Sequence, residues 1–174
     1  MKKKFVVPAL LAVLAVCLAT WQACKIPSWV STVEGIAKVA VPIAGQIADV
    51  VDPAATPIVK EVVDAFNVFI KALDQYKADP NATTLQAVES AFAVAAANVQ
   101  ALENAVNASG HVPEVVAAVI GLISTMVNEI ASDLPATPAT KKFRTAAAKH
   151  FTGDDFLAQF NALAAKYPQL HAIP

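Results

Sequence analysis

Three histidines and a pair of adjacent aspartates are the side chains of this chain whose types could support acid–base or metal chemistry. His111, His150 and His171 lie far apart in the sequence, and none of them belongs to an HExxH or CxxC motif. Isolated histidines of this kind are typical of protein surfaces and helix caps. We therefore expect no metal site, and no motif in the sequence indicates a cofactor.

Asp154 and Asp155 could form a general acid–base pair, but neighbouring residues on a helix point about 100° apart. Two carboxylates in the first turn of a helix complement the helix dipole, and we expect that role here. The chain contains neither a GxSxG nucleophile motif nor a glycine-rich phosphate loop. The sequence therefore predicts no catalytic residue and a protein that is not an enzyme. An enzymatic role would require a fold that brings His111 or His150 within hydrogen-bonding reach of two carboxylates.

The N-terminal segment has the order of an export signal. Three lysines at positions 2–4 precede an apolar run over residues 5–19, and this order resembles a bacterial secretory signal. The segment ends in Ala23-Cys24, which resembles a bacterial lipobox, where a small residue precedes the cysteine that receives the lipid. The resemblance implies a signal peptide over residues 1–23, lipid attachment at Cys24, and a place in the cell envelope or periplasm.

Two alternatives to lipidation stay open. Trp21 and Gln22 depart from the aliphatic and small residues usual in a lipobox, and ordinary signal peptidase would leave Cys24 as a free thiol. Cys17 lies within the export segment, so the mature chain would keep one cysteine and could form no internal disulfide. A lone thiol is a liability in an oxidising compartment, which favours lipidation. The second alternative is an uncleaved anchor, although the run is shorter than the ~20 residues of a spanning helix and contains Pro8.

Composition favours a single all-α domain over residues 24–174. Hydrophobic residues make up 56% of the chain and charged residues 16%, and there are only five glycines. Good helix formers dominate, and a chain of 174 residues suits one core. Apolar residues recur every three or four positions, and no stretch alternates as a strand would. We predict a compact bundle of about five to six amphipathic helices after the export segment.

Caps and prolines give the expected bounds of the first two helices. The first helix should run from an N-cap at Ser28 to Val51. Pro42 lies inside this pattern and lacks a backbone N–H, so we expect a kink or a break there. The second helix should open at Pro53 or Pro57, each of which follows a capping side chain.

The third and fourth helices should be the most regular. Thr83 and Gln86 form a possible capping box at the start of the third, and Gly110 should end it. Pro113 should open the fourth helix, in which residues 115–127 carry no charge. That stretch is ~20 Å long, shorter than the ~30 Å hydrocarbon core of a membrane, and favours a buried helix of the bundle over a membrane span. The expected buried stripe of the third helix consists of Leu85, Val88, Phe92, Ala95, Val99, Leu102 and Val106.

Charge divides the chain into an acidic body and a basic C-terminal part. Residues 24–136 hold five lysines against twelve acidic residues, whereas residues 137–174 hold five basic residues against two acidic ones. A nucleic-acid protein needs a basic field over its main surface, so we expect no nucleic-acid partner. Residues 137–174 should form a basic helical pair that contacts the acidic helices, with an anionic membrane surface as the alternative. The basic residues concerned are Lys141, Lys142, Arg144, Lys149 and Lys166.

Together these patterns indicate an exported bacterial envelope protein, held at the membrane through a lipid on Cys24, that acts as a non-catalytic binding or structural module. Its expected partners are the membrane and an envelope protein that the sequence does not identify. The alternative is a carrier of an apolar small molecule or lipid inside the bundle. That alternative depends on the Ala-rich third helix, which either packs closely against its neighbours, the default, or leaves a tunnel.

Overall fold

A computed structural model describes residues 26–174, apart from positions 49, 52, 54, 109, 111 and 144–149 and the side chain of residue 139. The described part of the chain is helical and contains no strand, which confirms the predicted all-α fold. Its helices are α2 (Ser28–Ile47), α3 (Thr56–Ala78), α4 (Ala82–Ala108), α5 (Glu114–Asp133), α6 (Pro138–Lys141) and α7 (Gly153–Lys166).

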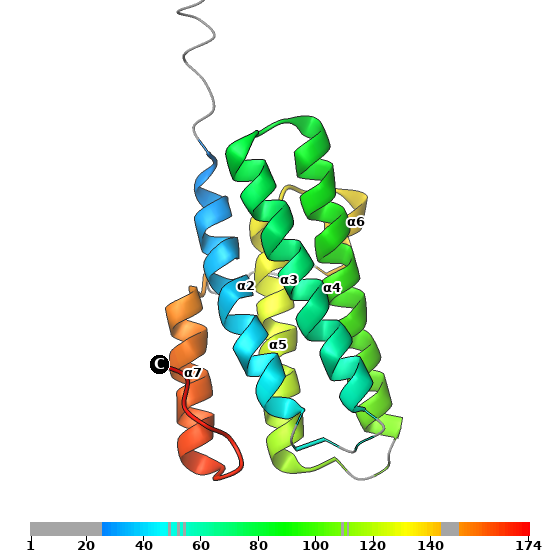
Figure 1. Ribbon diagram of the computed structural model, residues 1–174, viewed down its shortest axis with the longest axis vertical. Coiled ribbons are helices and arrows are strands. Elements are labelled where there is room, and N and C mark those ends of the chain that lie inside the picture. Colours follow the sequence, from blue (N-terminus) through cyan, green and yellow to red (C-terminus); the bar gives the residue numbers. More distant parts are fainter. Residues whose placement is uncertain are drawn as a thin grey trace, which may run out of the picture.

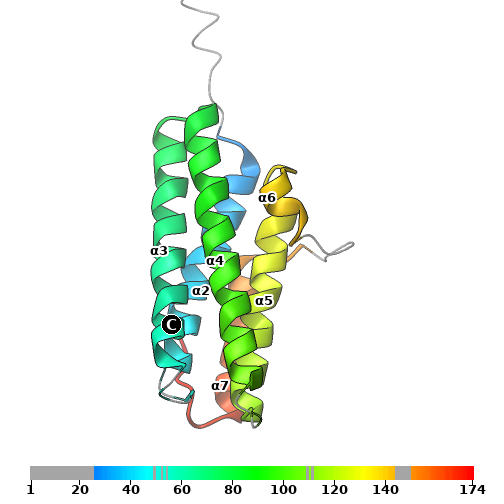
Figure 2. The same ribbon diagram turned by 90° about the vertical axis from the view of Figure 1, so that its right-hand side faces the viewer.

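Four long helices lie side by side as an elongated bundle (Figures 1 and 2). The α3–α4 hairpin packs against α2 and α5, and α2 and α5 also pack against each other. Helix α7 covers the outer side of α2 and α5, and the single turn α6 contacts α4 and α5. The core of the bundle is therefore enclosed by α2, α3, α4 and α5, with α7 added on one side.

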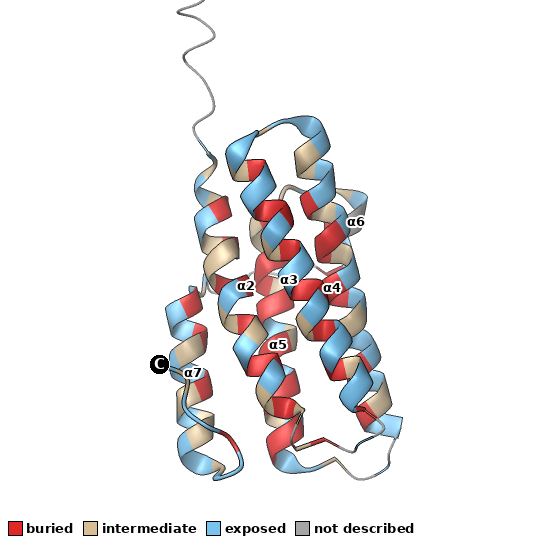
Figure 3. Ribbon diagram, viewed as in Figure 1, coloured by how far each residue is buried: buried red, intermediate tan, exposed pale blue. Residues whose placement is uncertain are grey.

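Apolar side chains at three- and four-residue spacing form the core, so that each helix buries one side and exposes the other (Figure 3). The buried stripe predicted for α4 is confirmed, except that Leu85 is only half-buried. Fully burying an aromatic or large aliphatic side chain contributes roughly 1.5–3 kcal/mol, so a few such residues carry much of the stability. The largest buried side chains include Phe66, Phe69, Phe92, Phe156 and Phe160.

Helix α2 continues through Pro42, so the predicted break does not occur. Pro42 is exposed, and the carbonyl that it leaves without an N–H partner belongs to Lys38, another exposed residue that water can reach. Ala40 and Ile43 are fully buried on either side of the proline and hold the helix against the core. The helix ends at Ile47, four residues before the predicted end.

Several predicted helix starts move by a residue or more. Asn81 caps α4, because its Oδ1 accepts hydrogen bonds from the backbone N–H groups of Thr83 and Thr84 at 2.9 and 3.0 Å. Thr83, the predicted cap, therefore lies inside the helix. Ser28 likewise is the first residue of α2, and its predicted capping role falls to Pro27, which offers no side-chain hydrogen bond. Gly110 ends the α4 region as predicted, with a φ of 72° that favours glycine.

Helix α5 is long and apolar enough to cross a membrane by length and composition alone, and it is the one described helix that is. It has eleven buried residues against eight in each of α2, α3 and α4. A helix packed against α2, α4 and α7 in this way is the central helix of a bundle, as predicted.

The C-terminal part contains two separate helices within the described residues. Helix α6 spans only four residues, and Arg144 and Lys149 of the expected basic helical pair lie outside the described residues. Helix α7 begins after Thr152, with a capping box between Thr152 and Asp155, and Asp154 and Asp155 lie in its first turn as expected. Within the described residues α6 and α7 do not touch each other, because α6 follows the end of α5 whereas α7 lies along α2 and α5.

Candidate functional site

His150 lies beside two carboxylates of α5. Its Nδ1 is 3.5 Å from Oδ1 of Asp133 and 3.6 Å from Oε1 of Glu129. Glu129 and Asp133 are four residues apart on the last turns of α5, so they share one side of that helix. The fold thus brings a histidine close to two carboxylates, at distances longer than those of charged hydrogen bonds, and this cluster of three residues is the candidate site.

The backbone around His150 is held at both ends of a short connection. The backbone N–H of Phe151 donates a hydrogen bond of 3.2 Å to Oε1 of Glu129, which ties the connection to α5. Thr152 and Asp155 then form the capping box that starts α7, with Asp155 Oδ2 accepting from the Thr152 N–H at 2.8 Å. The Phe151 ring also packs against Phe156 at 5.4 Å. These contacts fix the position of the backbone next to His150.

A close backbone contact between α2 and α7 also helps to position the connection that carries His150. Gly153, the first residue of α7, lies so near Gly35 of α2 that a Cβ on Gly153 would come within 2.7 Å of the Gly35 carbonyl oxygen. Glycine is therefore required at position 153 for the start of α7 to reach α2. The start of α7 in turn sets the position of the connection that carries His150.

Burial makes the two carboxylates electrostatically unusual. The Glu129 side chain is 2% exposed and that of Asp133 is 11% exposed, whereas His150 is 83% exposed. Burial raises the pKa of both carboxyl groups above its ordinary value, because it disfavours the charged form, although His150 opposes the rise at each of them. Among the described residues Oδ2 of Asp133 is buried and has no hydrogen-bond partner. The site therefore places acidic oxygens in the protein interior with few compensating donors.

The donor atoms of Glu129, Asp133 and His150 all lie within 4.8 Å of one another. Two carboxylate oxygens and one imidazole nitrogen are groups that hold divalent metal ions in proteins. No motif in the sequence indicates this cluster. The four-residue spacing of two acidic residues on the apolar stripe of α5 was a signal for the carboxylates, but no local pattern pairs them with His150, which follows the poorly patterned connection after α6.

The other predicted site residues stay apart from this cluster. Cys24, with the whole export segment, lies outside the described residues, as does His111. His171 is exposed near the C-terminus, where its backbone N–H donates to Oε1 of Gln46 at 3.3 Å. Asp155 has the predicted capping role.

The described basic residues do not form one cluster. Lys166 pairs with Glu114 at the start of α5, with a distance of 2.8 Å from Nζ to Oε1, which is the pairing predicted for it. Lys141 and Lys142 instead follow the other end of α5, and both are exposed. Helix α5 has 20 residues, so its two ends are about 30 Å apart.

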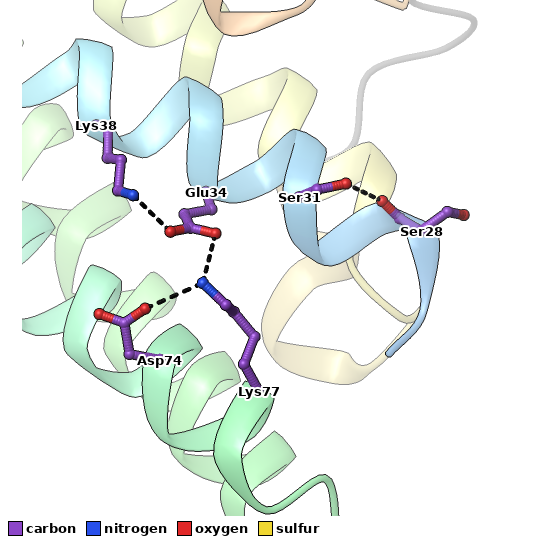
Figure 4. A network of polar contacts seen from close by, with 6 residues as sticks. All are labelled: Ser28, Ser31, Glu34, Lys38, Asp74 and Lys77. Atoms are coloured by element: carbon purple, nitrogen blue, oxygen red, sulfur yellow. Dashed lines mark hydrogen bonds and ion pairs between the residues drawn. The ribbon is translucent and has the colours of Figure 1, made fainter. Parts of the chain in front are cut away.

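A second polar network joins the first half of α2 to the end of α3 (Figure 4). Glu34 of α2 binds Lys38 at 2.6 Å and Lys77 of α3 at 2.9 Å, and Lys77 also reaches Asp74 at 3.3 Å. Hydrogen bonds from Lys38 and then Lys77 hold the pKa of Glu34 below its ordinary value. All three partners come from the same two packed helices, so the network is a structural clamp between α2 and α3.

Two hollows bear on the carrier alternative. One is an apolar gap between the end of α2 and the start of α5 that leaves no room for a water molecule. The other is an open, partly polar hollow of about 290 Å³ between α2 and the start of α7. Neither has the enclosed apolar form that suits a lipid chain. The carrier alternative stays a prediction.

The outer face of α4 is the one extended surface of a long helix whose exposed residues carry no charge, among the residues described. The outer face of neighbouring α3 contrasts with it, because exposed Lys60, Glu61, Asp64 and Lys71 lie there. Val94, at the middle of α4, is 56% exposed. The exposed residues of α4 are Ala82, Thr83, Gln86, Ala87, Ser90, Val94, Ala97, Gln100, Ala101, Asn104, Asn107 and Ala108.

Comparison of the chain with protein-family models, with curated proteins and with solved structures finds no match.

Proposed function

We propose that the chain is an exported bacterial envelope protein, held at the membrane through a lipid on Cys24, and that its bundle is a non-catalytic binding or structural module. The observation that carries the proposal is the order of the N-terminus. A basic end, an apolar run and the pair Ala23-Cys24 come immediately before a packed domain. Helix α2 begins at Ser28, four residues after Cys24, so a lipid on that cysteine would hold the bundle close to the membrane surface.

The arrangement of the helices supports an orientation in which the start of α2 and the turn α6 face the membrane. Both views place α6 toward the same end of the bundle as the start of α2 (Figures 1 and 2). Lys141 and Lys142, at the end of α6, are exposed. A lysine near an anionic membrane surface contributes about 1 kcal/mol, and stable anchoring usually combines a lipid with a second signal of this kind. These two lysines would thus face the membrane of a protein tethered at Cys24.

Contacts between the start of α2 and α3 also support a tether at this end of the bundle. Trp29 of α2 stacks on Tyr76 of α3, with ring centroids 5.6 Å apart, and the Glu34 clamp lies in the next turns. An aromatic pair contributes roughly 0.5–1.5 kcal/mol beyond its buried area. These contacts fasten the helix that follows the tether to the rest of the bundle.

The outer face of α4 is the surface that we assign to a protein partner. Interfaces are depleted of charge at their centre, and the exposed residues of α4 are uncharged along its whole length. The opposite side of α4 packs in the bundle core, so a partner would bind a helix that the core holds in place.

Membrane fractionation tests the tether. We expect the wild-type protein in the membrane fraction after a high-salt, alkaline wash, because a lipid anchor resists both treatments. The Cys24→Ser variant should lose this resistance or accumulate as the unprocessed precursor. Release of the wild type by the wash, or equal behaviour of the two proteins, would contradict the proposal.

Site-specific photo-crosslinking in intact cells tests the partner surface. A photoreactive amino acid at Ala97, on the exposed face of α4, should give a discrete crosslinked product. The same amino acid at Lys71, on the exposed face of α3, is the matched control and should give none. No product at Ala97, or the same products at both positions, would remove α4 as the binding surface.

A further inference from the structure

We propose that Glu129, Asp133 and His150 together bind one divalent transition-metal ion, with zinc as the ion that the donor set fits well. The proposal goes beyond the envelope tether, because it concerns the other end of the chain and would hold whether or not Cys24 carries a lipid. It also runs against the expectation from the sequence that the chain has no metal site, and the experiment below decides between the two.

The distances between the His150 nitrogen and the two carboxylate oxygens suit ligands of one metal ion. Hydrogen bonds between charged nitrogen and oxygen groups are about 2.7–2.9 Å long. The His150 nitrogen lies 3.5 and 3.6 Å from the two carboxylate oxygens, which is longer. Zinc binds nitrogen and oxygen ligands at ~2.0–2.2 Å in a tetrahedral arrangement, which separates two ligands by about 3.4 Å. The His150 nitrogen is therefore spaced from each carboxylate oxygen as two ligands of one small ion would be, and all three donor atoms lie within 4.8 Å of one another.

The buried negative charge of the two carboxylates also favours a bound cation. Glu129 and Asp133 are almost fully buried, and the removal of two carboxylates from water is costly unless each is compensated. The described site supplies one backbone donor to Glu129, from Phe151, and leaves Oδ2 of Asp133 buried without a partner. A single divalent cation would neutralise both carboxylates.

The surroundings of the cluster fit a metal centre with one open position. The Phe151 N–H orients Glu129 in the way that second partners commonly orient metal ligands. His150 is 83% exposed, so the side of the cluster away from α5 is open to solvent and can supply a water as fourth ligand. Three protein ligands are few for Ca²⁺, which takes six to eight oxygens, and Mg²⁺ prefers an octahedron of oxygens.

A direct ion pair is the competing interpretation. Protonated His150 would attract both carboxylates without any metal, and the same three residues would then only fasten the α7 connection to α5. The two interpretations differ in the effect of zinc. A metal site gains stability that grows with the logarithm of the free zinc concentration above its Kd, whereas an ion pair gains nothing from zinc.

Calorimetric titration with zinc chloride separates them. The full chain is purified in mild detergent with Cys17→Ser and Cys24→Ser in every variant, because free thiols bind zinc. After treatment with a chelator and dialysis, we expect one zinc per chain with a micromolar or tighter Kd, and no binding of Mg²⁺ or Ca²⁺ at the same concentrations. His150→Ala and Asp133→Asn should each weaken zinc binding at least about tenfold.

His171→Ala is the matched control, since it removes another exposed histidine outside the cluster, and it should leave the affinity unchanged. X-ray absorption of the zinc-loaded protein should show nitrogen and oxygen ligands at ~2.0–2.2 Å. Helicity by circular dichroism confirms that each variant folds, and His150→Ala decides the outcome if Asp133→Asn does not, because His150 is exposed. The absence of zinc binding, equal affinity in His150→Ala and the parent, or loss of binding in His171→Ala would each overturn the proposal.

Discussion

Glu129 shows how one residue can depart from the pattern of its helix for a local reason. It lies on the buried stripe of α5 next to Met126 and Ile130, where every other long side chain is apolar. Its only described donor is the Phe151 N–H, with His150 further away at 3.6 Å. A carboxylate in this position destabilises the bundle at neutral pH, unless a cation compensates it.

Glu129→Gln is expected to raise the free energy of unfolding at pH 7 by roughly 1 kcal/mol when metal is removed by a chelator. The pKa of Glu129 is raised in the folded protein, so its ionisation lowers the free energy of unfolding as the pH rises from 4.5 to that raised pKa. The charged groups that face Glu129 are Asp133, which adds to the rise in pKa, and His150, which opposes it. Below the ordinary pKa of 4.5 the carboxyl is protonated in both states, so the two proteins should have equal stability there. Urea denaturation at pH 4 and pH 7 measures the difference. A variant less stable than the wild type at pH 7 without metal would contradict this explanation.

Glu34 has the opposite electrostatic character, because Lys38 and Lys77 lower its pKa. Its contribution to stability should be present at neutral pH and disappear as the pH falls below 4.5 through the lowered pKa. We expect Glu34→Gln to reduce the free energy of unfolding by about 1 kcal/mol at pH 7. Asp64→Asn is the control, because it breaks the exposed Lys60–Asp64 pair and should change little. Equal effects of the two substitutions would argue against a clamp between α2 and α3.

At the scale of elements, the helices were predictable because their signals are local. Three- and four-residue spacing placed α4 and α5 correctly, and Gly110 ended the α4 region as predicted. The bounds were less certain where two capping residues compete, as Asn81 and Thr83 do. The candidate site could not be predicted, because Glu129 and His150 come from different elements and meet only through tertiary packing.

The contact between α2 and α7 is the tertiary feature that brings His150 to α5. Gly153→Ala should destabilise the protein by roughly 1–3 kcal/mol, because the added Cβ would lie 2.7 Å from a backbone oxygen of Gly35. Gly35→Ala is a matched control of opposite sign. A Cβ there meets its nearest atom at 4.0 Å, and alanine inside a helix is favoured over glycine by about 0.5–1 kcal/mol. Thermal melting of the two variants compares them, and a Gly153→Ala protein as stable as the wild type would show that α7 does not depend on this contact.

In the whole molecule, a tether at Cys24 would orient the bundle with the start of α2 and the turn α6 toward the membrane. Lys166 pairs with Glu114 at the opposite end of α5, so it should contribute little to membrane binding. The division of the basic residues between two ends follows from the separate positions of α6 and α7, which charge counting along the sequence could not reveal.

Vesicle co-sedimentation tests this orientation with a chain that lacks residues 1–24, so that no lipid or apolar segment contributes. On anionic vesicles, replacing both Lys141 and Lys142 by alanine should weaken binding by roughly 30-fold, since each lysine contributes about 1 kcal/mol. Lys166→Ala should have little effect. Equal losses from the two changes, or no loss on removal of Lys141 and Lys142, would contradict the orientation.

The intact mass of the protein extracted from bacterial membranes tests the lipid tether at Cys24. We expect a polypeptide that begins at Cys24 and carries the added mass of acyl chains, and a Cys24→Ser protein without that addition. A wild-type protein of unmodified mature mass, or one that keeps residues 1–23, would contradict the account.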